Sequence, residues 1–325
     1  MQSNKLIKYW PFAVIIVLVL LFFYQLAFTN LILARGDTYV YFYPYWDARD
    51  AALSDGQLPQ WTNELFMGAP LLANPQLGTF YPPNWLTIPF NAPDSIRISI
   101  LLHSFWATLG AYLLARRTLK LDELAALTAA IIFGLGGHVG AHVEQINQLQ
   151  SLAWMPWLLM LFNGALANPR RYLPLLGIAW AMQLLCGHTQ VVFMSGVLLG
   201  IYGIGRLVDV KIRADTPIHP YTRSFFRVFI ILSVAAISAI MLSLPQLLPT
   251  QELVSLSNRS EGFNQSQVTA FSLNPLLTGR GLLPSYDGQP FSEYIAYAGI
   301  IGFGLALVGL FSGHEQRRLW LAIVV

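Results

Sequence analysis

Apolar residues run along this chain in long blocks, and short polar connections separate the blocks. The first block, residues 11–33, would form a helix of ~35 Å at ~1.5 Å per residue, which exceeds a hydrocarbon core of ~30 Å. Further blocks cover residues 96–115, 124–143, 149–167, 173–187, 191–208, 225–248 and 294–312, and another begins at 319. This pattern predicts an all-α fold, a polytopic integral membrane helix bundle with about eight spans and the start of a ninth.

The composition indicates the same class of protein. Apolar residues make up 55% of the chain and charged residues 11%, whereas an ordinary soluble domain has ~25% charged residues. Lys5 and Lys8 precede the first block, so a cleaved signal peptide is the alternative to a membrane anchor. The apolar run is longer than the ~7–15 residues of a signal core, and residues 33–35 (Leu-Ala-Arg) form a poor cleavage site. We therefore expect the first block to remain in the membrane.

The basic residues fall mostly on one side of the threading that these blocks define. If the N-terminus is cytoplasmic, all but five of the 19 basic residues lie in cytoplasmic connections. The five on the opposite side are Arg35, Arg49, Arg97, Arg259 and Arg280. Cytoplasmic loops of membrane proteins carry the excess of Lys and Arg, so the sequence predicts a multi-pass protein with its N-terminus in the cytoplasm.

Two external segments, residues 34–95 and 249–293, are much longer than a helix connection needs. Both contain many Gly, Pro, Asn, Gln and aromatic residues, and disordered chains are poor in aromatics. We expect the two segments to fold as an extracytoplasmic cap, with residues 34–95 forming short helices and turns. The whole chain, 1–325, then makes one transmembrane domain, which we expect to continue past residue 325 because an apolar run is cut there.

One acidic residue stands at the expected membrane surface. Asp37 follows the first block, and residues 39–46 after it are mostly aromatic. Acidic residues at this depth are costly and usually functional. We therefore expect Asp37 to be partly buried under the aromatic rings, facing a groove open to lipid. The alternative is an interfacial aromatic belt with a solvated carboxylate.

Other polar residues cluster at the predicted external ends of later spans. They are His138, His142, His188, Gln190, Gln246 and Glu252. Polar groups confined to one face of a bundle indicate a site there, and we expect the last four to line one cavity with Asp37. His138 and His142 are four residues apart and could bind a metal, but the Glu of a zinc-hydrolase helix is missing. A structural role in bridging helices is favoured, and no metal is expected.

Several short motifs follow one another in a characteristic order. They are residues 55–63 (Asp-Gly-Gln-Leu-Pro-Gln-Trp-Thr-Asn), 73–84 (Ala-Asn-Pro-Gln-Leu-Gly-Thr-Phe-Tyr-Pro-Pro-Asn), 187–190 (Gly-His-Thr-Gln), 246–252 (Gln-Leu-Leu-Pro-Thr-Gln-Glu) and 293–299 (Glu-Tyr-Ile-Ala-Tyr-Ala-Gly). With Asp37 before them, these motifs resemble the YfhO family of bacterial membrane proteins, which belong with the type C (GT-C) glycosyltransferases. The resemblance spans nearly the whole chain. Thr62 departs from it, because an Asn often follows the Trp.

The resemblance implies a GT-C-like membrane enzyme that moves a sugar from a polyprenyl-phosphate donor to a glycan, lipid or polymer acceptor outside the cytoplasm. The acid of the first external loop is the catalytic base in such a family, which here means Asp37, and a carboxylate can take the proton of an attacking hydroxyl. Arg35 and Arg259 are candidates for binding the phosphate, and Tyr43 and Glu293 complete the substrate-binding candidates. The implied location is the bacterial cell membrane, with membrane lipid as a partner, no nucleic acid and no cofactor.

Two other functional classes stay open. A transporter or lipid flippase would place ionisable groups inside the spans, where His103 is the one candidate. A non-catalytic scaffold for envelope assembly would tolerate replacement of Asp37. The single Cys186 excludes an internal disulfide, and the glycines of residues 134–137 predict close helix approach rather than a phosphate-binding loop.

Overall fold

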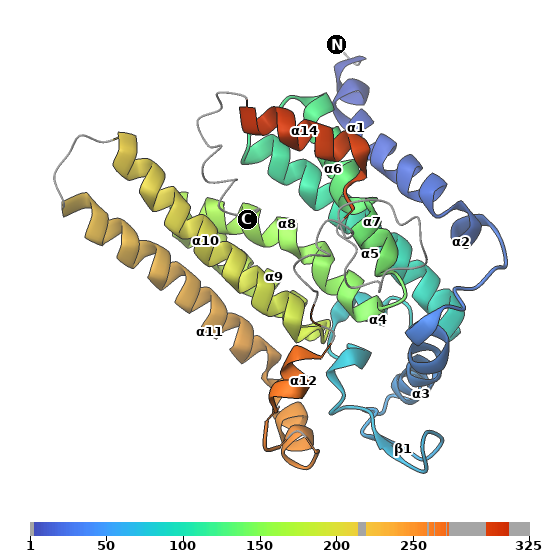
Figure 1. The fold of residues 1–325 in the computed structure, drawn as a ribbon. Helices are drawn as coiled ribbons and strands as arrows, with labels where there is room; N and C mark the ends of the chain where they lie inside the picture. Colours follow the sequence, from blue (N-terminus) through green and yellow to red (C-terminus); the bar gives the residue numbers. More distant parts are fainter. Residues whose placement is uncertain are drawn as a thin grey trace.

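The computed structural model describes residues 3–213, 219–258, 260–262, 264–270, 272 and 297–311. This part of the chain is mostly helical, with one two-stranded antiparallel sheet (Figure 1). The bundle contains α1 (Ser3–Phe22), α2 (Tyr24–Phe28), α5 (Ala92–Arg117), α6 (Glu123–Gly134), α7 (Gly137–Ala141), α8 (Ile146–Ala167), α9 (Pro169–Leu185), α10 (Thr189–Arg213), α11 (His219–Ser255) and α14 (Gly299–Phe311), and the short α12 (Gln265–Thr269) follows α11. The segment between α2 and α5 contains η1 (Thr38–Phe42), α3 (Tyr43–Ser54), β1 (Trp61–Thr62), β2 (Ala69–Pro70), η2 (Pro75–Leu77) and α4 (Pro82–Trp85). The prediction of a mostly helical fold is therefore confirmed for the described residues.

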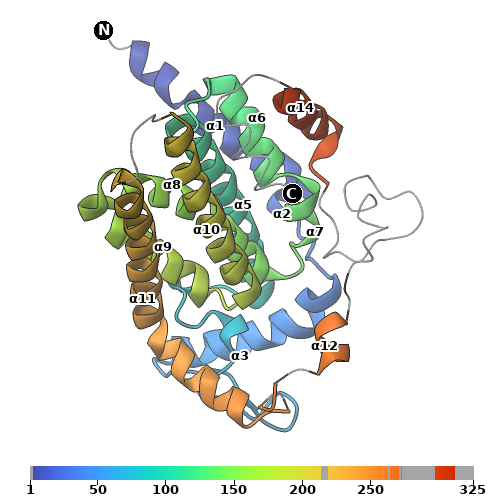
Figure 2. The same cartoon turned by 60° about the vertical axis from the view of Figure 1, so that its left-hand side comes forward.

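Most helices of the bundle pack against helices near them in sequence. α8 packs against both α5 and α9, α6 packs on α5, and α11 packs along α9. α10 contacts α8, α9 and α11, and α1 lies against α5 and α6 (Figures 1 and 2). One apolar core lies among α8–α11 around Phe162, Trp180 and Tyr202. A second lies among α1, α5 and α6 around Ile15 and Ala126.

The helix α5 shows how local sequence sets the bounds of a helix here. The Asn91 side chain accepts a hydrogen bond from the backbone N–H of Asp94, which caps the first turn. Arg116 and Arg117 stand in the last turn, where cations favour the helix dipole. The neighbouring helix α6 packs closely on α5, since a Cβ on Gly134 of α6 would lie 2.0 Å from the hydroxyl oxygen of Thr108 of α5. This contact agrees with the close approach predicted from the glycines of residues 134–137.

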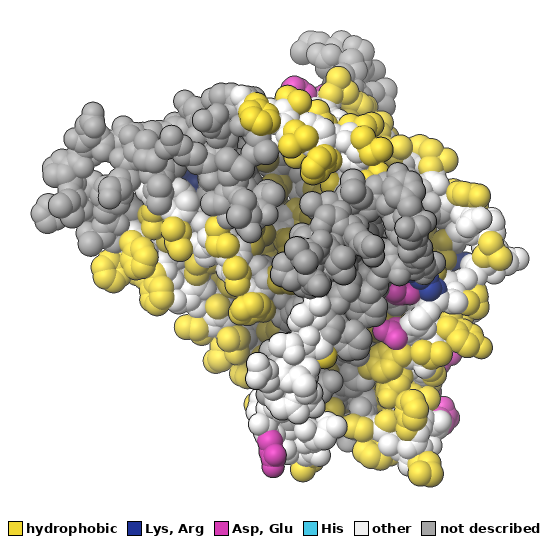
Figure 3. Space-filling model, in the orientation of Figure 1, with side chains coloured by type: hydrophobic (Ala, Val, Ile, Leu, Met, Phe, Trp, Pro, Cys, Tyr) yellow, Lys and Arg dark blue, Asp and Glu magenta, His cyan; other side chains and the backbone are white. Residues whose placement is uncertain are grey.

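Four helical stretches are long and apolar enough to cross a membrane. They are Ala92–Arg117, Glu123–Ala141, Thr189–Leu207 and Phe225–Ser255. Hydrophobic side chains cover the flank formed by α10 and α11 (Figure 3). The exposed ones include Phe193, Ile204, Phe229, Ile237 and Met241. A large exposed apolar surface marks an interaction site such as a membrane, so the chain has the surface and the helices expected of a membrane protein.

The other predicted spans differ in helix length: α1 has 20 residues and α8 has 22, or ~30 Å and ~33 Å of helix. In the first block, α1 ends at Phe22, α2 ends at Phe28, and the chain from Thr29 is no longer helical. The helix α9 has 17 residues, or ~26 Å of helix, which is shorter than a hydrocarbon core of ~30 Å. The first turns of α8 carry Asn147 and Gln150, both buried inside the bundle.

Residues 29–91 fold against one end of the bundle, which we name the loop end. Figure 2 shows α3 lying across this end. Phe42 and Trp46 pack there against Ile96 and Ile100 of α5. The prediction of short helices and turns is confirmed, and the segment also contains the small β1–β2 hairpin. In the second predicted segment α11 continues to Ser255, and most residues after 272 lie outside the described ranges.

Candidate functional site

Asp37 immediately precedes the π-helical turn η1, and its side chain is exposed without a capping hydrogen bond. Burial raises the pKa of Tyr41 to about 12, and the charge of Asp37 adds to this rise, so the two side chains are near each other. The predicted partial burial of Asp37 is wrong. Phe42 and Trp46 turn into the core instead, because aromatic rings gain from burial whereas a carboxylate loses its hydration.

Glu144, in the connection between α7 and α8, contacts the chain on both sides of Asp37. Arg35 Nε lies 3.1 Å from Glu144 Oε2. The hydroxyl of Thr38 donates to the backbone carbonyl of Glu144 at 2.8 Å. Arg35, predicted as a phosphate-binding cation, is therefore already paired with a carboxylate. Sequence analysis did not single out Glu144, because Thr38 and Glu144 are 106 residues apart.

Three of the predicted histidines come together beside this contact. The rings of His138 and His142 have centroids 4.3 Å apart, and His142 Nδ1 donates to the backbone carbonyl of His138 at 2.6 Å. His142 and His188 interact electrostatically. Burial lowers the pKa of His188, and its Nδ1 accepts a hydrogen bond from the backbone N–H of Val191 at 3.4 Å. These contacts fit the structural role favoured above, and the described residues contain no group of three or more His, Cys, Asp or Glu that could hold a metal.

Tyr43 and Gln246 act as tethers between segments. The Tyr43 hydroxyl donates to the backbone carbonyl of Leu33 at 2.9 Å, and burial raises the pKa of this tyrosine. The Gln246 amide donates to the backbone carbonyl of Leu72 at 2.9 Å. Gln246 therefore joins α11 to the segment before η2. Both side chains are buried in these contacts, so their polar groups hold the fold rather than line an open cavity.

The remaining predicted residues do not form the common cavity that we expected. Gln190 and Glu252 are exposed on α10 and α11. Both are long polar side chains near helix ends, where water satisfies them without a ligand. Arg259 and Glu293 lie outside the described residues.

The motifs of residues 73–84 and 187–190 meet at the loop end. A Cβ on Gly187 would lie 1.9 Å from the backbone oxygen of Pro75, and one on Gly78 would lie 2.6 Å from the amide nitrogen of Asn84. Both glycines have positive φ, +80° and +57°. Only glycine fits two such positions without strain, so these motif residues are explained by close packing between the segment and the start of α10.

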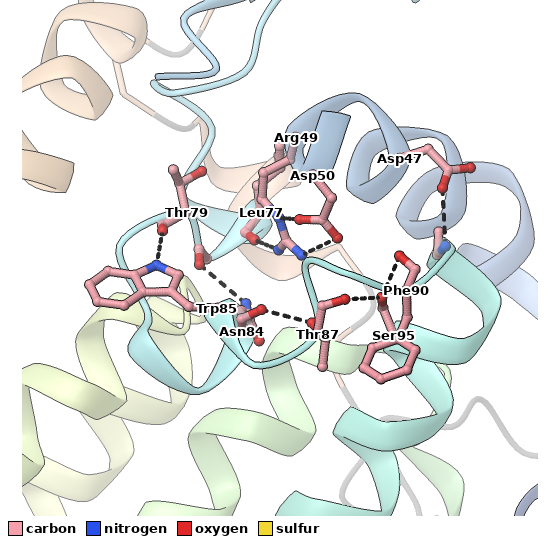
Figure 4. Close-up of polar contacts among 12 residues, drawn as sticks. Asp47, Arg49, Asp50, Leu77, Thr79, Asn84, Trp85, Thr87, Phe90 and Ser95 are labelled. Carbon is pink, nitrogen blue, oxygen red and sulfur yellow. Dashed lines mark hydrogen bonds and ion pairs between the residues drawn. The ribbon is translucent and has the colours of Figure 1, made fainter. Parts of the chain in front are cut away.

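A buried ion pair anchors α3 at the loop end (Figure 4). Arg49 Nε lies 2.7 Å from Asp50 Oδ1, and Arg49 also donates to the backbone carbonyl of Leu77. Asp47 accepts a hydrogen bond from the backbone N–H of Ala92 at 3.0 Å, at the first residue of α5. The acids of α3 therefore have structural partners. Sequence analysis could not predict these contacts. Neighbouring charged residues in a helix have the same sequence pattern whether they form a buried ion pair or lie on a solvent-exposed face.

Sequence analysis also missed a buried polar network that joins α5, α8 and Tyr81, the residue before α4. His103 Nδ1 donates to the backbone carbonyl of Ser99 at 2.7 Å, so its Nε2 accepts from the hydroxyl of Tyr81 at 2.8 Å. Trp154 Nε1 donates to the Tyr81 oxygen at 2.9 Å. The Gln150 amide donates to the hydroxyl of Ser99 at 3.0 Å. Ser99 and His103, spaced by four residues in an apolar helix, were the available signal for this network.

An apolar cavity of about 660 Å³ runs between α6, α7 and α14. Its lining includes Ala129, Ile132 and Gly302, and His138 and Tyr297 are its titratable lining residues. Asp37 is not part of this lining. His138 therefore lies between the cavity and the ring of His142, which is tilted by 49° relative to it.

No protein-family model matches this chain, and comparisons with curated proteins and with solved structures also give no match. What the protein does has to be inferred from its own residues.

Proposed function

We propose that this protein is a membrane glycosyltransferase that moves a sugar from a polyprenyl-phosphate carrier to an acceptor, with Asp37 as the base. The observation that carries the proposal is an exposed carboxylate held at the end of a bundle with apolar flanks. A lipid carrier keeps its tail in the bilayer while its phosphate reaches polar surroundings. Donor and base would then meet at this boundary.

The cavity beside α6 supports the same proposal. Its walls are mostly apolar and follow α6 and the residues after it, from Ala125 to Gly136, and His138 of α7 is one of its polar lining residues. An isoprenoid chain is an apolar ligand of suitable shape for such a groove, and ligand sites are typically apolar with a few polar groups at one end. The lipid would then be oriented with its phosphate toward the loop end.

The proposed reaction is a single displacement at the anomeric carbon. The acceptor hydroxyl oxygen forms a bond to this carbon, and the bond from the carbon to the carrier phosphate oxygen breaks. Asp37 takes the hydroxyl proton as general base. The carrier leaves as a phosphate anion, so no acid has to protonate it.

The finer architecture belongs to the same proposal. We infer about eight spans and the start of a ninth, a GT-C-like arrangement related to the YfhO family, with the N-terminus cytoplasmic and the loop end outside a bacterial cell. The helices of membrane length and the basic residues of the cytoplasmic connections support this threading. The acceptor is then a glycan, lipid or polymer of the cell envelope.

The test uses the purified full chain in liposomes with undecaprenyl-phosphate glucose and undecaprenyl-phosphate N-acetylglucosamine as donors. Membranes from a deletion strain provide the acceptor, and released undecaprenyl phosphate is measured. Asp37→Asn keeps the shape of the side chain but lacks the basic oxygen, so release should fall by ~10²–10⁴-fold. Asp55→Asn is the matched control, since Asp55 is an exposed acid of the same segment, and it should release carrier at the wild-type rate.

Two outcomes would overturn the proposal. Equal release by the wild type and by Asp37→Asn would remove the base role. Failure of the folded wild type to consume either donor would favour an envelope-assembly scaffold. A transporter is disfavoured by His103, whose two ring nitrogens are both occupied by hydrogen bonds within the protein.

A further inference from the structure

Glu144 lies against three residues that flank Asp37 in sequence: Arg35, Gly36 and Thr38. Its carboxylate pairs with Arg35 at 3.1 Å, and its backbone carbonyl accepts from the Thr38 hydroxyl at 2.8 Å. Between these two contacts, a Cβ on Gly36 would lie 2.8 Å from Glu144 Oε2. Residues 35, 36 and 38 are therefore fixed against one residue of a distant element, while the Asp37 side chain stays exposed.

Gly36 shows that the approach of this loop to Glu144 is built into the backbone. Its φ is +46°, in the left-handed region that favours glycine. Any larger residue would both strain the backbone and displace the Glu144 carboxylate. A glycine before Asp37 therefore lets the loop take this path without strain and without moving the Glu144 carboxylate.

Glu144 itself is held firmly. The residues beside it, Val143 and Ile146, are buried in the core formed with α3 and α5. The backbone N–H of Gln145 donates to the carbonyl of His142 at 3.1 Å. The connection between α7 and α8 is thus a rigid support, and the loop that carries Asp37 takes its position from it.

The exposure of the Arg35 and Glu144 side chains indicates that their ion pair affects the position of the loop more than the global stability of the protein. The Arg35 side chain is 49% exposed and that of Glu144 is 13% exposed. Ion pairs of this kind add little to global stability because water screens them. Misplacing a reacting group by about 1 Å, in contrast, can cost ~10²-fold in rate.

We propose that Glu144 is the positioning residue for Asp37, holding the loop from Arg35 to Thr38 so that the carboxylate has one fixed orientation. The catalytic part of this statement rests on the proposed function, in which Asp37 is the base. The geometric part does not depend on it. The test therefore has two separate arms.

The first arm measures the order of the loop. Cys186 is the chain's one cysteine and is buried, so Asp37→Cys introduces an exposed thiol that can carry a nitroxide spin label. We expect a broad electron paramagnetic resonance spectrum in this background and a shift to faster nanosecond motion when Glu144→Gln is added. Arg35→Met should give the same shift, and Arg35→Lys should restore slow motion by keeping the charge.

The matched control is Glu123→Gln. Glu123 also pairs with an arginine, Arg116, at 3.9 Å, but at the opposite end of α6. It should leave the spectrum unchanged. The wild-type chain is treated with the label in the same way and gives the background signal. Its one thiol, Cys186, is buried and should not react. Unchanged motion of the label in Glu144→Gln would overturn the positioning role.

The second arm uses intact Asp37 and the donor assay described above. Glu144→Gln should lower kcat by up to ~10²-fold with little change in KM for the donor. Arg35→Lys should retain more activity than Arg35→Met. A faster label with unchanged kcat would overturn the link to catalysis. A faster label in a protein that consumes no donor would instead keep the positioning role and refute the proposed function.

Discussion

The ion pair Arg49–Asp50 gives the sharpest test of the energetics at the loop end. Their side chains are 1% and 7% exposed, and two contacts join them, at 2.7 Å and 3.1 Å. The guanidinium also lies 4.1 Å from the ring centroid of Trp46. Burial lowers the pKa of Arg49 and raises that of Asp50, so each charge is disfavoured alone. The perturbation is Asp50→Asn, which keeps the shape but removes one of the two charges.

The magnitude follows from the geometry. Two unit charges about 4 Å apart attract by ~4 kcal/mol at an effective dielectric constant of ~20. Breaking a buried pair by removing one partner costs ~3–5 kcal/mol, because the other charge stays buried without compensation. We therefore expect Asp50→Asn to lower the free energy of unfolding by ~3–5 kcal/mol. The double variant Arg49→Met with Asp50→Leu should lose less than the single one, since no isolated charge remains.

The assay is unfolding of the purified protein in mixed micelles by sodium dodecyl sulfate, followed by the fluorescence of its nine tryptophans. Asp55→Asn, at an exposed acid just after the same helix, is the control and should change the unfolding free energy by no more than ~0.5 kcal/mol. A loss for Asp50→Asn within that control range would refute the reasoning. So would a double variant that is less stable than Asp50→Asn.

Three further outcomes follow from the loop end. Gly187→Ala should destabilise the protein by more than ~1–2 kcal/mol in thermal unfolding, because its Cβ would meet the Pro75 carbonyl at 1.9 Å and its φ is +80°; Gly200→Ala, in an open helical position, should be neutral or stabilising. Acidification from pH 7.5 to 5.5 should lower the melting temperature, because burial lowers the pKa of His188 below its unfolded value and the unfolded state therefore binds the proton first from pH ~6.5 downward. The variant His188→Gln should show a weaker dependence of melting temperature on pH. An equally steep dependence in this variant would contradict the assignment to His188. Gln246→Leu should cost ~1 kcal/mol, because the part-buried carbonyl of Leu72 loses its donor. A melting temperature equal to that of the wild type would contradict this expectation.

The sequence alone determined the elements that depend on local composition. The continuous apolar blocks at 96–115, 191–208 and 225–248 became α5, α10 and α11. A long apolar run has one stable arrangement in or beside lipid, a helix that satisfies its own backbone hydrogen bonds. The aromatic content of residues 34–95 likewise predicted a folded segment. These properties are carried by neighbouring residues and do not depend on the rest of the chain.

The tertiary structure alone decided which polar groups are paired and which remain open. Asp37 is exposed while Asp50 is buried with Arg49, although both acids follow or flank aromatic residues in the same segment. The partner of the Asp37 loop is Glu144, which lies 106 residues after Thr38. Such contacts depend on the packing of α3, α7 and α8 around one end of the bundle, and hydrogen bonds and ion pairs act only over a few ångströms. Sequence spacing therefore could not predict them.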